Sequence, residues 1–311
     1  MAKILITESV HPIGPELLTA AGHTVVYADR DMDIIRREIV DADAVLVRII
    51  ELPGSLLATE KNLKIVSKHG VGYDNIDLDY CKSHGVAVTI TPNANSLSVA
   101  EHAFTLMLTL AKNIIPVSNE YRTVGFAAKN HAPGIEMTGK TLGLIGMGRI
   151  GKHVLHMCKD GLDMHVIVYD PYISEVPEGV EKVDDLSELL RRADVVTLHC
   201  LLTDETRKLI DRERLALMKP TALLINCARG PIVDEAALIE ALENGRLAGA
   251  GLDVTDPEPV APDSPLFKLP NVIVTPHYAP TTVESATRVS KIAAENINAV
   301  LAGQEPVGRI V

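Results

Sequence analysis

The stretch Lys140-Thr-Leu-Gly-Leu-Ile-Gly-Met-Gly-Arg-Ile-Gly-Lys152 lies near the middle of the chain and gives the clearest indication of its fold. The apolar run before its glycines predicts a buried parallel strand, and the residues through Lys159 predict a helix. The glycines have G-x-G-x-x-G spacing. Gly146 permits a tight turn, Gly148 lets the backbone approach a pyrophosphate, and Gly151 lets the helix pack close to the strand. The free N–H groups at the helix start favour phosphate binding, so the stretch predicts a dinucleotide site.

A second apolar run, Val166–Tyr169, predicts the next strand, and Asp170 ends it. The acid follows the glycines at about the 20-residue spacing that places a carboxylate on a ribose hydroxyl. A carboxylate there accepts from the 2′-hydroxyl of NAD and repels the 2′-phosphate of NADP, so we predict NAD. A glycine-rich turn without a ligand, with an exposed acid after the next strand, is the less favoured alternative.

The whole chain sets the class of protein. Its 311 residues suit about two domains, and 47% of them are hydrophobic. Lys and Arg number 30 against 41 Asp and Glu, a net charge of −11, which argues against a nucleic-acid partner. We find no apolar run of signal-peptide or membrane-spanning pattern, so we predict a cytoplasmic protein without membrane contact. The cysteines lack metal-ligand spacing, which predicts reduced thiols and no metal site; they are Cys81, Cys158, Cys200 and Cys227.

Strand-like and helix-like segments alternate along the chain, which predicts an α/β protein with two doubly wound parallel sheets. The first repeat lacks the glycine turn, so we expect a flavodoxin-like substrate domain there and a Rossmann NAD-binding domain after it. We predict a discontinuous substrate domain, residues 1–98 with 284–311, and an NAD-binding domain, residues 99–283. Predicted helices include 14–21, 32–40, 96–114, 204–218, 234–244 and 281–302. The apolar segment 96–114 predicts a core helix and leaves a role in a subunit interface open.

Three polar groups follow predicted strands, where ligands bind in open α/β sheets. Arg229 follows the apolar run 222–225, Glu258 lies in Asp256-Pro-Glu-Pro259, and His277 follows the run 272–275. An imidazole can serve as acid or base, a carboxylate can orient it, and a guanidinium can bind a substrate carboxylate and polarise its carbonyl. Each residue alone has an ordinary alternative: a solvated Arg, a stiff loop and a structural His. Together they suggest interconversion of a carbonyl and an alcohol, with a cofactor carrying the hydride.

At these residues the chain resembles the D-2-hydroxyacid dehydrogenase family, in its phosphoglycerate dehydrogenase-like branch. The resemblance covers nearly the whole length. Besides the glycine turn with Asp170, it rests on Gly70-Val-Gly-Tyr-Asp-Asn-Ile-Asp77, Asn95-Ser-Leu-Ser-Val-Ala-Glu101, Asn226-Cys-Ala-Arg-Gly-Pro-Ile-Val-Asp234, Gly251-Leu-Asp-Val254, Asp256-Pro-Glu-Pro259 and Thr275-Pro-His277.

The resemblance implies roles for particular residues. Arg229, Glu258 and His277 are the expected catalytic residues, and Asp253 is expected to bond the nicotinamide carboxamide. Further expected cofactor contacts are Arg149, Ile150, Cys200 and Cys227. The expected substrate contacts are Arg48, Val71, Gly72 and Arg229. The family also implies a homodimer.

Some positions depart from the family pattern. Leu201 replaces a usual proline, Ile49 and Ile50 replace small polar residues beside Arg48, and the tryptophan usual before the glycine turn is missing. The neighbours of Arg48 leave phosphoglycerate open as substrate. A second anionic group on the substrate could be read by Arg48 or Lys68, or both could be solvated surface charges. No regulatory domain is expected after Val311.

Two functions follow from the sequence. The first is an NAD-dependent enzyme that interconverts a D-2-hydroxy acid and its 2-oxo acid. The alternative is an NAD(H)-sensing, corepressor-like binding protein of the same fold. The three polar residues favour the enzyme, although corepressor-like relatives keep them as well.

Overall fold

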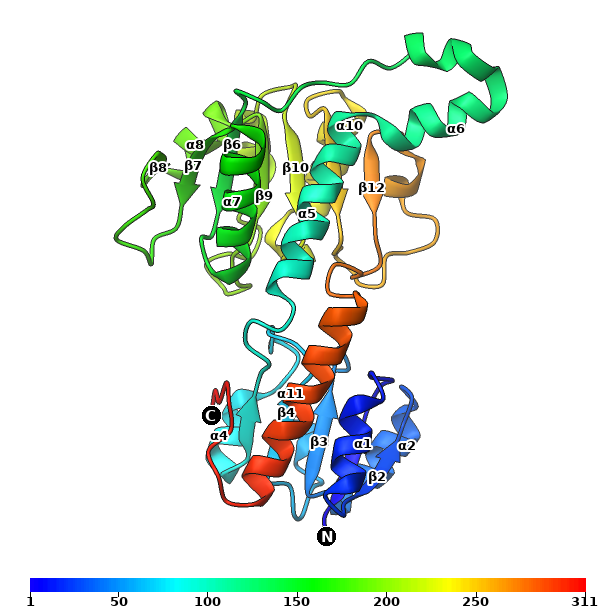
Figure 1. Cartoon of the computed structure of the whole chain (residues 1–311), viewed down its shortest axis with the longest axis vertical. Coiled ribbons are helices and arrows are strands. Elements are labelled where there is room, and N and C mark those ends of the chain that lie inside the picture. Colours follow the sequence, from blue (N-terminus) through cyan, green and yellow to red (C-terminus); the bar gives the residue numbers. More distant parts are fainter. The chain divides into compact units, whose positions relative to one another are not determined.

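Every strand of the chain pairs in parallel with its neighbours, in two separate sheets. The computed structural model describes all residues, 1–311, and divides them into two units (Figure 1). The first unit comprises Met1–Asn95 with Pro280–Val311, and the second comprises Ser96–Ala279. The fold class predicted from the sequence is confirmed, because each unit is a parallel sheet covered by helices.

The first unit contains a five-stranded sheet of order β2-β1-β3-β4-β5, the flavodoxin-like order. Its strands are β1 (Lys3–Ile6), β2 (Thr24–Tyr27), β3 (Ala44–Val47), β4 (Ile65–Lys68) and β5 (Ala87–Thr89). Its α-helices are α1 (Ile13–Ala20), α2 (Met32–Glu38), α3 (Gly54–Leu57), α4 (Leu78–His84) and α11 (Val283–Leu301). The central strands β3 and β4 are buried throughout; β3 is accordingly all apolar, whereas β4 ends in two buried polar residues, Ser67 and Lys68.

Helix α11 completes the first unit from the far end of the chain. Its residues Ala293, Ala294 and Ile297 are fully buried in a cluster that includes Ile4, Leu46 and Ile65 of the sheet. Helix α1 packs closely against α11: a Cβ at Gly14 would lie only 2.4 Å from the Ser290 hydroxyl oxygen. Small residues therefore set the distance between the two helices.

The second unit contains a seven-stranded sheet of order β12-β11-β10-β9-β6-β7-β8. Its strands are β6 (Thr141–Ile145), β7 (His165–Tyr169), β8 (Val180–Lys182), β9 (Val195–Leu198), β10 (Leu223–Asn226), β11 (Gly249–Leu252) and β12 (Val272–Val274). Its α-helices are α5 (Ser96–Ala111), α6 (Ile114–Val124), α7 (Arg149–Leu162), α8 (Leu186–Arg192), α9 (Arg212–Leu217) and α10 (Glu235–Glu243). The strand order reverses between β6 and β9, where ligands bind in this kind of sheet.

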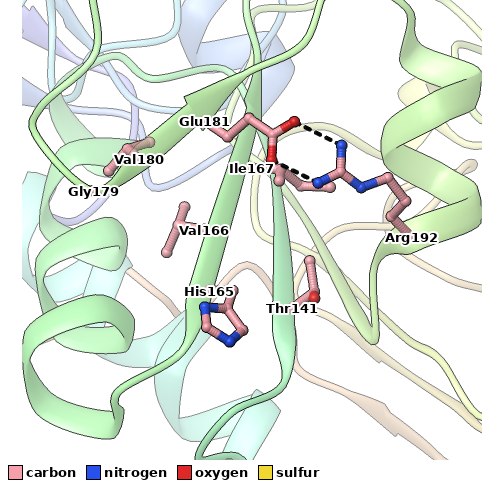
Figure 2. Close-up of a pocket in the computed structure, with 8 residues that line it drawn as sticks. All are labelled: Thr141, His165, Val166, Ile167, Gly179, Val180, Glu181 and Arg192. Carbon is pink, nitrogen blue, oxygen red and sulfur yellow. Dashed lines mark hydrogen bonds and ion pairs between the residues drawn. The ribbon is translucent and has the colours of Figure 1, made fainter.

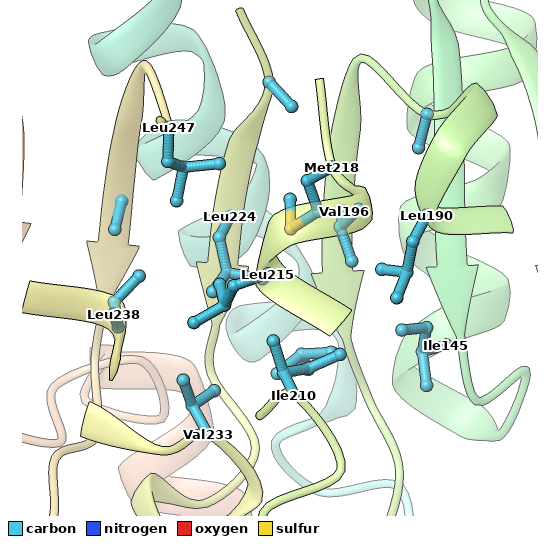
Figure 3. Packing of buried hydrophobic residues seen from close by; sticks show 14 of the residues in the cluster. Ile145, Leu190, Val196, Ile210, Leu215, Met218, Leu224, Val233, Leu238 and Leu247 are labelled. Carbon is cyan, nitrogen blue, oxygen red and sulfur yellow. The ribbon is translucent and has the colours of Figure 1, made fainter. Parts of the chain in front are cut away.

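Two apolar clusters cover the two faces of the second sheet. Helices α8, α9 and α10 pack on one face, where Leu190, Leu215 and Leu238 meet Val196 and Leu224 (Figure 3). Helices α5 and α7 pack on the other, with Met107 and Val154 against Leu142 and Val166 among the contacts. Helices on both faces are what a doubly wound sheet requires.

The prediction of a helix over 204–218 is wrong for its first half. Residues 204–207 form a turn, and helix α9 begins only at Arg212, capped by Asp211, whose carboxylate accepts from the Arg214 N–H. In the turn the Thr206 hydroxyl donates to the carbonyl of Leu201 at 2.6 Å. Short hydroxyl side chains of this kind offer the backbone an alternative to helical bonds.

Candidate active site

The phosphate turn lies between β6 and α7. Gly146 has φ +88°, and a Cβ there would stand 2.8 Å from the Cys200 nitrogen, so only glycine fits. A Cβ at Gly151 would meet the Gly146 carbonyl oxygen at 2.3 Å, whereas nothing lies within 4 Å of one at Gly148. The open space at Gly148 and the close packing at Gly151 fit a pyrophosphate held against backbone.

Helix α7 begins at Arg149 and Ile150, with Gly148 as its N-cap. No side chain caps this end, so its first N–H groups remain available as donors to a ligand. Together with the helix dipole they form a site suited to phosphate. The residues present therefore fit a dinucleotide.

Asp170 follows β7 and is tied to the phosphate turn. Its Oδ2 accepts from the Met147 N–H at 2.8 Å, and its Oδ1 accepts from the Tyr172 N–H at 3.0 Å. Each oxygen keeps a lone pair for a ribose hydroxyl. The Tyr172 hydroxyl donates to Glu205 at 2.9 Å, a contact that was not predicted from the sequence.

Arg229 emerges three residues beyond β10. Asn226, at the end of β10, shapes this turn: its Nδ2 donates to the Arg229 carbonyl at 2.9 Å and its Oδ1 accepts from Ala228 N at 3.0 Å. The Arg229 side chain is half-buried, and its Nη1 donates to the Ala228 carbonyl at 2.7 Å. A Cβ at Gly230 would stand 1.9 Å from the Thr255 carbonyl oxygen, so the loops that carry Arg229 and Glu258 pack without room for a side chain.

His277 and Glu258 are brought together from the ends of β12 and β11. The His277 Nδ1 lies 2.7 Å from the Glu258 Oε1. An ionised carboxylate only accepts, so we assign the proton to Nδ1, which leaves Nε2 as the nitrogen available to a reactant. His277 has φ +53°, an uncommon conformation for a residue with a side chain, and such strain clusters at functional sites.

Asp253 holds the backbone around His277. Its side chain is 1% exposed and accepts from the N–H groups of Tyr278 at 2.7 Å and Ala279 at 2.9 Å. The Thr275 hydroxyl donates to the same carboxylate at 2.6 Å, and the His277 N–H donates to the Asp253 carbonyl at 2.8 Å. The carboxylate is thus an anchor for the loop that carries His277, and its contact with a nicotinamide carboxamide stays a prediction.

His102 of α5 joins this network, although it was not predicted from the sequence. Its Nε2 lies 3.0 Å from the Thr275 hydroxyl and 3.4 Å from Asp253 Oδ1. A single His on an apolar helix gives little sign of a polar partner 151 positions further along the chain; the spatial contact is the only signal.

The two cysteines near the site offer backbone rather than thiolate chemistry. Burial raises the pKa of Cys200 to about 11 and that of Cys227 well above its ordinary value. Both thiols are therefore neutral near pH 7 and poor nucleophiles. Cys200 adjoins the phosphate turn through its backbone nitrogen, and Cys227 directly follows β10.

The predicted substrate residues lie at the carboxyl ends of strands in the first unit. Arg48 follows β3, and its Nη1 donates to the Ser9 carbonyl at 2.8 Å. Val71 and Gly72 lie just beyond β4, after Gly70. Lys68 is only 6% exposed, so the alternative that it is a solvated surface charge is wrong.

A cavity of about 380 Å³ in the second unit lies elsewhere (Figure 2). Thr141, His165 and Val180, which line it, begin β6, β7 and β8, so it opens at the amino ends of the strands. Glu181 and Arg192 form a two-pronged ion pair across it at 2.6–2.7 Å (Figure 2). Ligands bind at the opposite, carboxyl edge of such sheets, so we do not assign the cavity to the site.

No group of three or more His, Cys, Asp or Glu side chains is placed to hold a metal ion. Measured against the thickness of a bilayer, every helix is too short or too polar to span it.

Comparison with known proteins agrees with this geometry. Residues 104–279 match the family described as D-isomer specific 2-hydroxyacid dehydrogenase, NAD binding domain. A D-3-phosphoglycerate dehydrogenase of Methanocaldococcus jannaschii is 42% identical over 308 residues, which cover 98% of this chain and 58% of that protein. The chain spans little more than half the length of this and two further D-3-phosphoglycerate dehydrogenases that it matches, from Archaeoglobus fulgidus and Synechocystis.

Two solved structures share the fold over nearly their whole length. The first is an NADPH-dependent glyoxylate/hydroxypyruvate reductase of Sinorhizobium meliloti in complex with NADP and malonate; it is 28% identical with a TM-score of 0.90, and the match covers 100% of this chain and 97% of that one. The second is a D-lactate dehydrogenase of Aquifex aeolicus complexed with NAD and lactic acid; it is 32% identical with a TM-score of 0.87, and the match covers 96% of each chain. From its phosphate turn, its two parallel sheets and these matches, the chain belongs to the D-isomer-specific 2-hydroxyacid dehydrogenase family.

Proposed function

We propose that the protein is an NAD-dependent dehydrogenase that interconverts a D-2-hydroxy acid and its 2-oxo acid. The observation that carries the proposal is the 2.7 Å contact between His277 and Glu258, at the same sheet edge as the phosphate turn. An imidazole paired with a carboxylate beside a dinucleotide site supplies the proton transfer that carbonyl reduction needs.

A bound nicotinamide cofactor supplies the hydride chemistry. In the reducing direction, His277 donates a proton from Nε2 to the substrate oxygen as the carbonyl becomes an alcohol. Glu258 accepts a hydrogen bond from Nδ1–H of His277, which fixes the tautomer and stabilises the protonated ring. Arg229 binds the substrate carboxylate in a two-pronged manner and polarises the carbonyl. In the oxidising direction His277 takes the proton back.

The remaining site residues have supporting roles in this proposal. The backbone of Gly146–Gly151 and the start of α7 bind the pyrophosphate, and Asp170 binds the ribose. Arg48, Val71 and Gly72 bind the substrate. The cytoplasmic location and the lack of nucleic-acid and membrane partners stay predictions.

An assay of a panel of 2-oxo acids with NADH tests the proposal. We expect turnover of at least one 2-oxo acid, with the D-hydroxy acid as product, at a kcat within the usual range of about 1–1,000 per second. Binding of NADH without turnover of any panel member would instead support the sensing protein of the same fold.

We propose NAD over NADP because Asp170 would face the 2′-position, where its carboxylate would accept from a hydroxyl and repel a phosphate. We expect Asp170→Ala to weaken NADH binding and to narrow the preference over NADPH by about ten-fold, the worth of one charged hydrogen bond. Dissociation constants for both cofactors check this, with exposed Asp184→Ala as the control. Tighter binding of NADPH than NADH by the wild type would refute the assignment.

We also propose a homodimer, in which α6 and the turn after it contribute to the interface. This segment extends away from the β6–β12 sheet (Figure 1), and none of the residues of α6 is buried. Phe126 is 72% exposed, and Ile114, Tyr121 and Val124 are exposed as well. A cluster of exposed large apolar residues marks an interaction site.

The dimer is checked by sedimentation velocity. We expect the wild type to sediment with the mass of two chains and the double variant Val124→Asp/Phe126→Asp to shift toward one chain. Val307→Asp, at an exposed apolar residue of the first unit, is the control and should leave the mass unchanged. A wild type that sediments as a single chain contradicts the proposal.

A further inference from the structure

Glu8 is a buried carboxylate to which the proposed mechanism gives no role. It lies two residues beyond β1 and is 2% exposed. Its Oε2 accepts from the Arg48 N–H at 2.7 Å, and its Oε1 accepts from the Ile49 N–H at 2.8 Å and the Ile50 N–H at 3.2 Å. Three consecutive backbone N–H groups therefore converge on one carboxylate.

The carbonyl groups of the same segment are held from the other side. Lys68 donates from its Nζ to the Arg48 carbonyl oxygen, and Asn75 donates from its Nδ2 to the Ile50 carbonyl oxygen at 2.6 Å. Both side chains are buried, and Lys68 also donates to the Asn75 Oδ1 at 2.5 Å. The segment 48–50 thus lies between a buried carboxylate and a buried ammonium group.

Hydrogen bonds to ionised groups are stronger than neutral ones, and a buried N–H without a partner is costly. Glu8 therefore fixes the backbone from which the Arg48 side chain projects. The next residue, Ser9, accepts from the Arg48 guanidinium through its carbonyl at 2.8 Å. One short segment, Glu8–Ser9, sets both the backbone and the side-chain position of Arg48.

We propose that Glu8 is a positioning residue for substrate binding, acting through Arg48. The inference rests on the proposed function, in which Arg48 contacts the substrate. The ammonium of Lys68 is directed to the Arg48 carbonyl and Asn75, so Lys68 supports the loop, whereas the guanidinium of Arg48 is the group proposed to contact the substrate. A preformed cation needs no reorganisation when the substrate binds.

Glu8→Gln tests this at nearly constant volume. The amide keeps one acceptor oxygen but turns an NH2 group toward backbone N–H donors, so the loop loses part of its support. We expect KM for the 2-oxo acid to rise about ten-fold, the effect of losing one charge-assisted bond, with kcat within a few-fold and the NADH dissociation constant unchanged. Glu16→Gln, at an exposed Glu of α1, is the matched control and should leave KM unchanged.

A double variant separates positioning from general damage. If Glu8 acts through Arg48, Glu8→Gln adds little to the KM of Arg48→Ala, because coupled residues are not additive. Hydrogen exchange of the amides of residues 48–50 provides a readout without catalysis and should accelerate in Glu8→Gln but not in Glu16→Gln. Glu8→Asp keeps the charge on a shorter side chain and should give a smaller rise in KM. This variant tests the proposal if Glu8→Gln does not fold.

The outcomes distinguish the two proposals. A wild type that turns over a 2-oxo acid, with KM unchanged in Glu8→Gln and Glu8→Asp, overturns the role of Glu8 and leaves the dehydrogenase standing. Full additivity with Arg48→Ala, or no effect of Arg48→Ala on KM, overturns it as well. A wild type without turnover of any 2-oxo acid overturns the proposed function and this inference together.

Discussion

Turnover of the His277→Ala variant is expected to fall by about two to four orders of magnitude, the range of a positioned proton transfer. The imidazole is the only group that the mechanism gives for delivering a proton to the substrate oxygen, and Glu258 holds it at 2.7 Å. The measurement is kcat with the best 2-oxo acid, and the dissociation constant of NADH should hardly change.

A second His–carboxylate pair in the same unit provides the control for this variant. His156 lies 2.5 Å from Asp160 on the surface of α7, and His156→Ala should keep wild-type turnover. Glu258→Gln should lower kcat less than His277→Ala, because it weakens the orientation of the ring without removing it. Near-full turnover of His277→Ala, with chemistry rate-limiting, would show that the proton comes from elsewhere.

Arg229→Lys should lower kcat/KM by about 100-fold although the charge is retained. The planar guanidinium binds a carboxylate through two parallel bonds, whereas an ammonium is a point charge, and the loss of one charged bond with its geometry costs about 2–3 kcal/mol. The packing of Gly230 against Thr255 fixes the loop, so backbone movement cannot bring the Lys ammonium closer to the substrate carboxylate.

The control for Arg229→Lys is Arg246→Lys, a change at an exposed arginine that pairs with Glu240. The kcat/KM of both variants is measured with the same 2-oxo acid. That variant should match the wild type. Wild-type efficiency in Arg229→Lys would show that only the charge matters, and a loss confined to NADH binding would move Arg229 from the substrate to the cofactor.

The fold was predictable where its signals are local. The apolar run, the three glycines and Asp170 lie close together in sequence. Strands β6 and β7 and helix α7 begin within one residue of their predicted starts, and α7 continues three residues beyond the predicted end at Lys159. Strand β8 was not predicted, because Val180–Lys182 is a short edge strand with one apolar residue. The helix over 204–218 was misjudged because threonine side chains bond the backbone in its first half, a choice that residue pattern alone does not reveal.

The candidate site was predictable where topology suffices. Parallel strands end at one edge, so polar residues that follow them meet there, and the pairing of His277 with Glu258 is an example. The partners of buried charges were not predictable in this way. Glu8 stands just beyond a strand as Asp170 does, but its acceptor role depends on three amides 40 to 42 positions away.

The placement of α11 has a consequence for synthesis on the ribosome. Strands β1, β3 and β4 emerge early, but the helix that covers Ile4, Leu46 and Ile65 is made roughly 190 residues after β5, about 10–40 s later at ordinary rates of translation. During that interval the second unit, a continuous segment, can fold completely, while the first keeps an apolar face open to solvent. The unit that begins first is therefore the last to finish, and until α11 is made its uncovered apolar sheet is prone to aggregation.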